Sequence, residues 1–472
     1  MTAIPFPLSS SPGEKPQEGG GRLINALAEK TGDGARFPVI WKRTPGLRQQ
    51  LSIATYTHLR GAILVGSTLI VVLNTRAQTV TVSGVTYSAT DRGAIAGTDK
   101  VTIAKNNAGT PNIVCVSTEG CFNLFTASGP SSFADADLPQ PNSVCVLDGY
   151  FAWSIGDGRF FASDLNAVTV SASSFTTEQG LAGRRVVSFR GEIFYFGDKW
   201  TGVYRNAATS PFPFERRFTI ARGIAGTHAI AGWEPGWANE LIWVGEDLKV
   251  YRMNGYTPES ISTSDVERAI QSCDDTTLLE ASVYMHEGNP IWQLTSPGEW
   301  TWEHNLKTGN WHERQSYGRE DCRMSTAVKA FDVWLSGDRT TGKLFKIDPT
   351  YYREADDPLI WTVESGIVAN FPARMSAPRA DFDFTAATGM ASGEDPIQTN
   401  PKVRIGTSND GGYSWGNAVE RALGAQGVSN PSVSVNRTGI IKARGRRHRL
   451  QVSDPVHVGL MGGQLATMQR AA

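Results

Sequence analysis

The stretch "SVCVLDGYFAWSIGDGRFFASDL", from Ser143 to Leu165, shows the pattern from which the fold can be predicted. Short apolar and aromatic runs alternate with Asp-Gly pairs at 148–149 and 157–158. Asp-Gly between two apolar runs is a strong signal for a tight β-hairpin, because both residues tolerate the positive φ angles that such turns need. The stretch therefore predicts antiparallel strands joined by short turns.

The same pattern recurs along much of the chain, from about residue 51 to residue 347. Further copies occupy residues 112–127, 186–206, 239–255, 289–314 and 331–348. They recur at irregular intervals of roughly 30–50 residues, with turn signals every ~8–12 residues, which is typical of a sandwich, a barrel or a propeller. The aromatic clusters and a length of about 300 residues favour an all-β propeller of about six blades, because one blade takes roughly 40–50 residues.

The two ends of the chain have a different texture from this repeating region. The Pro- and Gly-rich start predicts an extended N-terminal arm over residues 1–46, packing on the C-terminal part, with a helical turn or a strand at "RLINALAE", residues 22–29. Residues 47–355 form the predicted propeller, and residues 356–472 a second, sandwich-like β unit. The best helix candidate is "SDVERAI", residues 264–270, with Ser264 as its N-cap.

Charge and cysteine content exclude several classes of protein. Among 472 residues there are 45 basic and 46 acidic side chains, so no overall charge calls for a nucleic acid or membrane partner. The five cysteines are odd in number and form no C-x-x-C pair, which disfavours a disulfide framework and a zinc site. The N-terminus lacks signal-peptide character, and the longest apolar run is too short and too broken to span a bilayer. We expect a protein made in a cytoplasm, with reduced thiols and no membrane insertion.

One motif near the C-terminus raises the question of catalysis. "SNDGGYSWG" resembles the S-x-D-x-G-x-x-W "Asp box" of sialidases and other propeller glycosidases, with Ser408, Asp410, Gly412 and Trp415 at the matching positions. Its Asn, Asp and Gly residues are turn formers, and an alternating strand precedes them. The motif therefore predicts a hairpin over which the Trp415 ring folds and becomes buried, while a sialidase-like or carbohydrate-binding propeller stays open as the alternative.

Other catalytic signatures are weak in this sequence. It contains no phosphate-binding loop, no dinucleotide fingerprint and no paired metal-binding histidines. His304 and His312, which flank Trp302 and Trp311, are predicted to lie on a strand surface rather than to bind a metal. The carboxylates that could serve as acid or base are Asp157, Asp164, Glu287 and Glu303. Spacing alone cannot pair them as glycoside hydrolysis requires, so we predict no catalytic, metal or cofactor site.

A basic segment follows the Asp box. Between Glu420 and Asp454 no acidic residue occurs, whereas seven basic residues do, five of them within the segment Lys442, Arg444, Arg446, Arg447 and Arg449. On a strand, Lys442, Arg444, Arg446 and His448 would share one face, and Arg447 and Arg449 the other. Two interpretations remain open: contact with DNA phosphates or an acidic partner, and an exposed strand surrounded by solvent.

Several stretches, taken in order, resemble the tail hub or nozzle proteins of short-tailed bacteriophages, known as packaged-DNA stabilisation proteins. The resemblance runs from about residue 22 to residue 463, and the stretches that carry it are "RLINALAEK…RTPGL", "DGYFAWSIGDGRFFASDL", "RGIAGTHA", "VYRMNGYTPESISTSDVERAI", "TGNWHERQS", "RADFDFTAATG", "SNDGGYSW" and "GRRHRLQVSDPVHVGLMGG".

The resemblance implies a structural virion protein rather than an enzyme, built as a propeller with a platform domain. Six copies would form a ring below the portal and adaptor rings, made in the host cytoplasm and located in the virion tail. The ring would extend the DNA channel, retain packaged double-stranded DNA and carry tail fibres or tailspikes. The Asp box would then be a structural turn in the platform.

Overall fold

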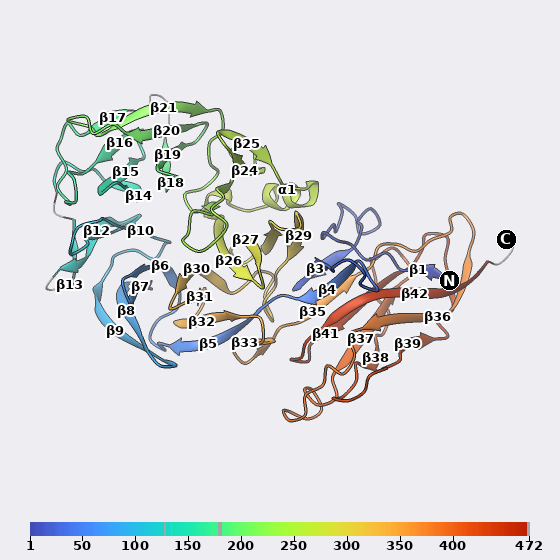
Figure 1. Cartoon of the computed structure of the whole chain (residues 1–472). Helices are drawn as coiled ribbons and strands as arrows, with labels where there is room; N and C mark the ends of the chain where they lie inside the picture. The colour runs from blue at the N-terminus through green and yellow to red at the C-terminus, as the bar shows by residue number, and fades with distance from the viewer. Residues whose placement is uncertain (127–128, 134, 178–181, 470–472) are drawn as a thin grey trace.

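The computed structural model describes residues 1–126, 129–133, 135–177 and 182–469. It consists of a ring of small sheets and a second body of two larger sheets, and the first and last strands, β1 (Thr2–Ala3) and β42 (Gly459–Gln469), lie in the second body (Figure 1). Within the described residues, α1 (Ser264–Gln271) and a short 3-10 turn (Thr276–Leu278) are the helical elements. The predicted all-β class is confirmed.

Each blade of the ring is an antiparallel group of four strands, formed in chain order from the centre outwards. The first three blades are β6 (Leu59–Val65), β7 (Thr68–Leu73), β8 (Arg76–Ser83) and β9 (Thr86–Ala94); β10 (Thr102–Lys105), β11 (Ile113–Ser117), β12 (Gly120–Thr126) and β13 (Gly129–Ser132); and β14 (Pro141–Leu147), β15 (Tyr150–Ile155), β16 (Arg159–Ala162) and β17 (Phe175–Thr177). The next three are β18 (Gly183–Phe189), β19 (Glu192–Gly197), β20 (Thr201–Asn206) and β21 (Phe214–Ile220); β22 (Ile230–Ala231), β23 (Ile242–Val244), β24 (Val250–Asn254) and β25 (Thr257–Ser260); and β26 (Glu280–His286), β27 (Asn289–Ser296), β28 (Trp300–Asn305) and β29 (Asn310–Glu313).

The last blade closes the ring with a strand from the start of the chain. It combines β30 (Met324–Ala330), β31 (Val333–Asp338) and β32 (Lys343–Asp348) with β5 (Gly46–Ser52), and the small strands β33 (Arg353–Glu354) and β34 (Asp357–Pro358) continue this sheet. The innermost strands β30 and β6 contact each other, so the structure forms a closed propeller of seven four-stranded groups. Closure removes exposed innermost edges, which is the physical advantage of a propeller.

The turns of the blades follow the chemistry predicted from the sequence. Asp148 and Gly149 have φ angles of 51° and 90° and connect Leu147 to its partner Tyr150. Arg190-Gly191 and Glu287-Gly288 have the same pair of positive φ angles. The predicted helix is present as α1, but its N-cap is Thr263, whose hydroxyl accepts from the Val266 N–H, and Ser264 is the first helical residue.

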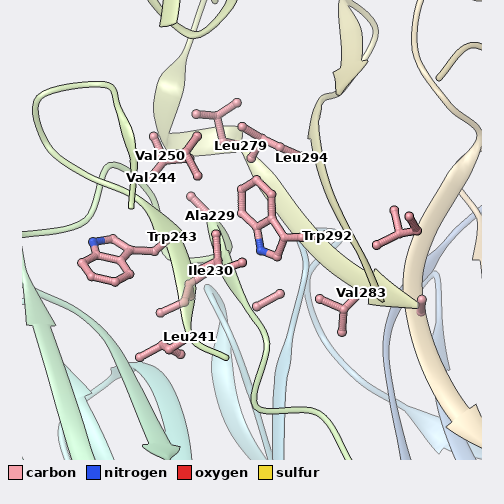
Figure 2. Packing of buried hydrophobic residues seen from close by; sticks show 14 of the residues in the cluster. Ala229, Ile230, Leu241, Trp243, Val244, Val250, Leu279, Val283, Trp292 and Leu294 are labelled. Carbon is pink, nitrogen blue, oxygen red and sulfur yellow. The ribbon is translucent and has the colours of Figure 1, made fainter. Parts of the chain in front are cut away.

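The propeller core lies between blades and is rich in tryptophan. Figure 2 shows Trp243 of β23 and Trp292 of β27 among aliphatic side chains from the fifth and sixth blades, including Val244, Leu279 and Leu294. Both rings are fully buried. A buried aromatic side chain of this size removes roughly 150–250 Å² from water, so the large rings fill the widening space between neighbouring blades.

The second body, which we call the platform, is a sandwich of two sheets. One sheet contains β2 (Arg22–Ile24), β35 (Trp361–Glu364), β41 (Arg447–Val452), β37 (Lys402–Ser408) and β38 (Val419–Ala422). The other contains β3 (Ala26–Lys30), β4 (Val39–Arg43), β42 (Gly459–Gln469), β36 (Met375–Phe384) and β39 (Val433–Asn436), with β1 (Thr2–Ala3) beside β42 and β40 (Ile440–Ile441) beside β36. A separate apolar core containing Trp41, Trp361 and Phe382 lies between them.

The propeller and the platform share one continuous sheet. Strand β2 pairs in parallel with β29 of the sixth blade, with Ile24 opposite Glu313, and in antiparallel with β35 of the platform. Asn25 follows β2 with a φ of 53°, and its buried amide donates to the carbonyls of Gln315 and Ile360. The segment "RLINALAE" is therefore two strands, β2 and β3, separated by a left-handed residue, rather than a helical turn.

Candidate interaction site on the platform

The Asp-box motif forms the connection between β37 and β38. Ser408 donates a hydrogen bond of 2.6 Å to the Asp410 carboxylate and accepts one of 2.8 Å from the Gly412 N–H. The Ser414 N–H donates to both carboxylate oxygens at 3.0 Å. These hydrogen bonds, first from Ser408 and then from Ser414, hold the pKa of Asp410 well below its usual range. The carboxylate is thus engaged by the turn that contains it.

Trp415 lies differently from its predicted position. Its ring is half-buried rather than enclosed, and the guanidinium of Arg449 lies 3.9 Å from the ring centroid. Arg449 also donates to Glu364 at 2.7 Å. The ring therefore packs over the hairpin and forms a cation–π contact with β41. This contact stabilises the fold less than complete burial of the indole would.

The basic segment is not one strand with alternating faces. Lys442 and Arg444 are exposed in a turn between β40 and β41, whereas Arg446 and Arg447 are only 2% exposed. The prediction that Arg446 shares an exposed face with Lys442 and Arg444 was wrong, because Gly445, with a φ of 90°, breaks the strand and resets the alternation.

The buried arginines hold the platform together. Arg446 donates to the Asn409 side chain at 2.7 Å and to the Ile440 carbonyl, and Arg447 donates to the Gly19 carbonyl of the N-terminal segment. Burial lowers the pKa of both guanidinium groups. The neighbouring His448 is buried too, and burial together with Arg446 lowers its pKa to about 3.

The exposed part of the basic segment and the Asp-box turn meet in one depression of about 520 Å³. Its lining comes from four separate segments of the chain: Gln17, Arg374, Asn409, Asp410, Ile440, Lys442, Ala443 and Arg444. Gln17 donates to the Asp410 carbonyl at 2.9 Å, which ties the N-terminal segment to the turn. The depression therefore presents three basic side chains and one carboxylate.

Sequence reasoning missed Arg374 and Gln17 in this site. Arg374, Lys442 and Arg444 are exposed, and none has an ion-pair partner within the described ranges. Arg374 is far from the basic segment in the chain and reaches it because β40 pairs with the start of β36, where Met375 lies opposite Ile441. No local sequence signal indicates that pairing.

The residues considered for acid–base chemistry lie in different surroundings. Asp157, Asp164 and Glu287 are exposed, whereas Glu303 is completely buried, accepts from the Tyr284 hydroxyl at 2.9 Å and lies 2.9 Å from Nε2 of His312. Burial raises the pKa of Tyr284, and Glu303 adds to the rise. His304 lies in β28 and His312 in β29, and both side chains are buried. In the part of the chain that the structure describes, no group of three or more His, Cys, Asp or Glu side chains could hold a metal ion.

The remaining sequence predictions concern thiols and membranes. All five cysteines are free, and Cys115, Cys145 and Cys322 are buried. Burial raises the pKa of each of these three thiols to about 12. Among the helices of the described residues, none is long and apolar enough to cross a membrane.

A closed all-β propeller with a sandwich platform defines the class of this protein. The family model described as "Bacteriophage P22 Gp10, beta-propeller" matches residues 71–352, which is more than half of the chain. The chain belongs to this family, and the resemblance to the phage DNA-stabilisation proteins is confirmed. It is thus a phage structural protein of β-propeller type.

Two solved structures are similar in fold at low sequence identity. The WD40 β-propeller domain of Doa1 is 9% identical, with a TM-score of 0.42, over 64% of this chain and 96% of that one. PorZ of the type-IX secretion system of Porphyromonas gingivalis is 10% identical, with a TM-score of 0.38, over 70% of this chain and 44% of that one. No curated protein matches the sequence.

Proposed function

We propose that this protein is the tail hub of a short-tailed phage, a homohexameric ring that docks below the portal and adaptor rings and extends the DNA channel. The family match over residues 71–352 is the observation that carries the proposal. In this role the ring retains packaged DNA and carries fibres or spikes on its outside, and the protein acts without a catalytic site.

The joint between propeller and platform suits a protein that bears load. A shared sheet crosses from β29 through β2 to β35, and buried polar bonds at Asn25 support it. A ring made of identical copies uses heterologous contacts that close only with the last copy. Such a ring needs each copy to keep a fixed angle between its parts, which a continuous sheet provides.

The basic depression on the platform fits transient contact with DNA or an acidic neighbour. Arg374, Lys442 and Arg444 are exposed cations, and none forms an ion pair with any described residue. The nearby Asp410 carboxylate is already bonded by Ser408 and Ser414. Phosphate contacts by Lys and Arg are independent of sequence and weaken with salt. A small local cluster on a chain of net charge −1 would hold DNA without stopping its passage.

The proposal is tested by locating and counting the protein in phage particles. Electron micrographs of particles labelled on this chain should show label at the tail, and mass measurement of the isolated tail complex should give six copies. Label elsewhere, or a stable dimer or trimer in the tail, would contradict the hub assignment.

The contact surface is tested by reversing its exposed charges. The double variant Lys442→Glu/Arg444→Glu should melt like the wild type, since exposed substitutions change stability by no more than about 0.5 kcal/mol. In a complementation assay it should yield fewer DNA-filled heads, most clearly at low salt, where screening is weakest. The matched control Lys105→Glu/Lys199→Glu alters two exposed propeller lysines and should give normal yields. Normal yields from both variants would leave the segment as a solvated turn.

The glycosidase alternative predicts turnover of sialosides, lipopolysaccharide or capsular polysaccharide by the purified protein. We expect none, because the carboxylate of the Asp-box turn is bonded within that turn and Glu303, one of the candidate acid–base residues, is fully buried with Tyr284. Turnover that is lost in Tyr284→Phe, in a variant that still folds, would overturn the structural interpretation.

A further inference from the structure

A large cavity lies at the centre of the propeller, where the innermost strands begin. It has a volume of about 850 Å³, and every blade contributes to its lining. Many of the lining residues lie just before or at the start of the innermost strands, such as His58 before β6, Lys100 before β10 and Glu280 in β26. Others, such as Thr118 and Arg339, lie in the turns that follow β11 and β31. A sphere of that volume is about 12 Å across, close to the diameter of an α-helix with its side chains.

The other end of the central channel is closed by the long connection between β22 and β23, residues 232–241. Trp237 donates to the Tyr284 carbonyl in the sixth blade at 3.1 Å, and Gly236 packs against the Lys329 side chain in the last blade. Pro235 and Gly236 also share a depression with Gly66 of the first blade. A connection from the fifth blade that reaches the last and first blades crosses the axis, so the cavity is a blind pocket rather than a through-channel.

The pocket wall carries more positive than negative charge. Four lining side chains are Lys or Arg and two are Asp or Glu. Glu280 lies between two of the cations: it is 3.0 Å from the Lys100 ammonium and forms a second ion pair with Arg339. Burial opposes ionisation of Glu280, but Arg339 and Lys100 outweigh it and lower its pKa to about 2. One carboxylate therefore pairs with two cations, and the cluster of Lys100, Glu280 and Arg339 carries one excess positive charge.

Arg184 is the cation in the wall without a protein partner. It lies at the start of β18, is half-buried, and makes no hydrogen bond or ion pair with any described residue. Its Nε is inaccessible to solvent and has no acceptor. Arg319, by contrast, is paired with Asp321 at 2.7 Å. Because Arg184 is half-buried, unpaired and part of the pocket wall, its charge favours an oxyanion in the pocket, where charge-assisted hydrogen bonds are strong.

We propose that the blind pocket at the centre of the propeller is a binding site for an oxyanion, a phosphate or a carboxylate group, held by Arg184 and the Lys100–Glu280–Arg339 cluster. Arg184 supplies the open guanidinium fork, and the excess charge of the cluster supplies attraction across the pocket. The hydroxyls of Thr98, Thr227 and Thr340 also line the wall and can donate to the anion. Because the pocket lining contains no Phe, Tyr or Trp, stacking of a sugar or base has no platform there.

Calorimetric titration of the full chain with inorganic phosphate and with acetate, each against chloride at equal ionic strength, tests the site. We expect saturable binding of one or both oxyanions and none of chloride, and the tighter of the two identifies the source of the group. Arg184→Gln should weaken that binding at least tenfold. The control Arg205→Gln removes an exposed arginine paired with Glu215 on the outer part of the fourth blade and should bind like the wild type.

Absence of saturable binding for both oxyanions, or equal binding by Arg184→Gln and the wild type, would overturn the proposal. Equal weakening by Arg205→Gln would also overturn it, because it would indicate unspecific attraction. If Arg184→Gln does not fold, crystals of the wild type soaked in selenate decide the question by anomalous scattering. A selenium peak within reach of Arg184 supports the site, and peaks only elsewhere refute it.

Discussion

The propeller and the platform are both all-β, but they are assembled in opposite ways. Among the described strands of the propeller, hydrogen-bonded neighbours are almost always consecutive, and the exceptions are β5 in the last blade and β2 beside β29. In the platform, β42 pairs with β1, β4 and β36, so that Thr2 lies opposite Leu465 at the other end of the chain. Pairing of strands so far apart in sequence has a larger entropic cost of loop closure, and this cost arises before the stabilising contacts form. The platform therefore depends on strand pairing between distant parts of the chain, whereas most blades are built from strands that are neighbours in the sequence.

The largest expected loss of unfolding free energy follows from substitution of Arg314, which lies where the chain passes from the platform into the propeller. Arg314 is fully buried, forms a 2.8 Å ion pair with Glu354 and donates to the Pro45 carbonyl in the segment that leads into β5. Burial lowers the pKa of Arg314, but Glu354 and other nearby acidic groups, Glu303 among them, together outweigh burial and raise the pKa. Arg314→Met leaves Glu354 buried and uncompensated, which should cost about 3–5 kcal/mol of unfolding free energy.

Denaturant unfolding measures that cost. Arg205→Met, which removes an exposed ion pair with Glu215, is the control and should cost no more than ~1 kcal/mol. Equal, small losses in both variants would mean that stability does not depend on the buried Arg314–Glu354 pair.

The next largest loss of stability should distinguish the buried part of the basic segment, which includes Arg447, from its exposed part, which includes Arg444. Arg447→Met removes the hydrogen bond to Gly19 that ties the N-terminal segment to β41, and should cost about 1–3 kcal/mol. Arg444→Met, three residues earlier and exposed, should stay within about 0.5 kcal/mol of the wild type. Thermal melts of the two variants decide this, and the reverse order would break the assignment of Arg447 to folding.

A pH dependence sharpens the comparison on the propeller side. Burial raises the pKa of Glu234, in the connection that closes the channel, to about 7. The folded state therefore retains a proton that the unfolded state releases near pH 4.3, so this group's contribution to stability is full below that pH and is lost as the pH rises towards 7.

At pH 7 the free energy of unfolding of Glu234→Gln should consequently exceed that of the wild type by ~1–2 kcal/mol, after allowance for the partial exposure of the side chain. The variant should therefore melt at a higher temperature. The difference should vanish near pH 4. Glu14→Gln alters an exposed carboxyl and should reproduce the wild-type profile. A pH-independent difference for Glu234→Gln would show that Glu234 is ionised in the fold.

The same contrast explains what the sequence could predict. Asp148-Gly149 and Arg190-Gly191 adopt the turns that their residue types favour, so the blades follow from local pattern. The fourth strand of the last blade, β5, lies far from its partner Lys346 in sequence and could not be assigned to it. Within the site, the Asp-box turn follows from its own residues, whereas the burial of Arg446 depends on Gly445 and on Asn409 across the sheet.

The smallest effect is expected from the Asp-box turn, since its bonds are local and exposed. Asp410→Ala removes the acceptor of Ser408 and Ser414, while the strands β37 and β38 on either side remain paired. We expect a slight decrease in melting temperature and, more clearly, faster hydrogen exchange at the Ser414 amide. Because hydrogen bonds depress the pKa of Asp410, its contribution is present above the usual aspartate pKa of about 4 and is lost as the pH falls through its lower folded value. The difference from Asp410→Ala should therefore shrink only in strong acid. Unchanged exchange at Ser414 would mean that the turn holds its shape without the carboxylate, and that Asp410 is free to act on a partner in the depression.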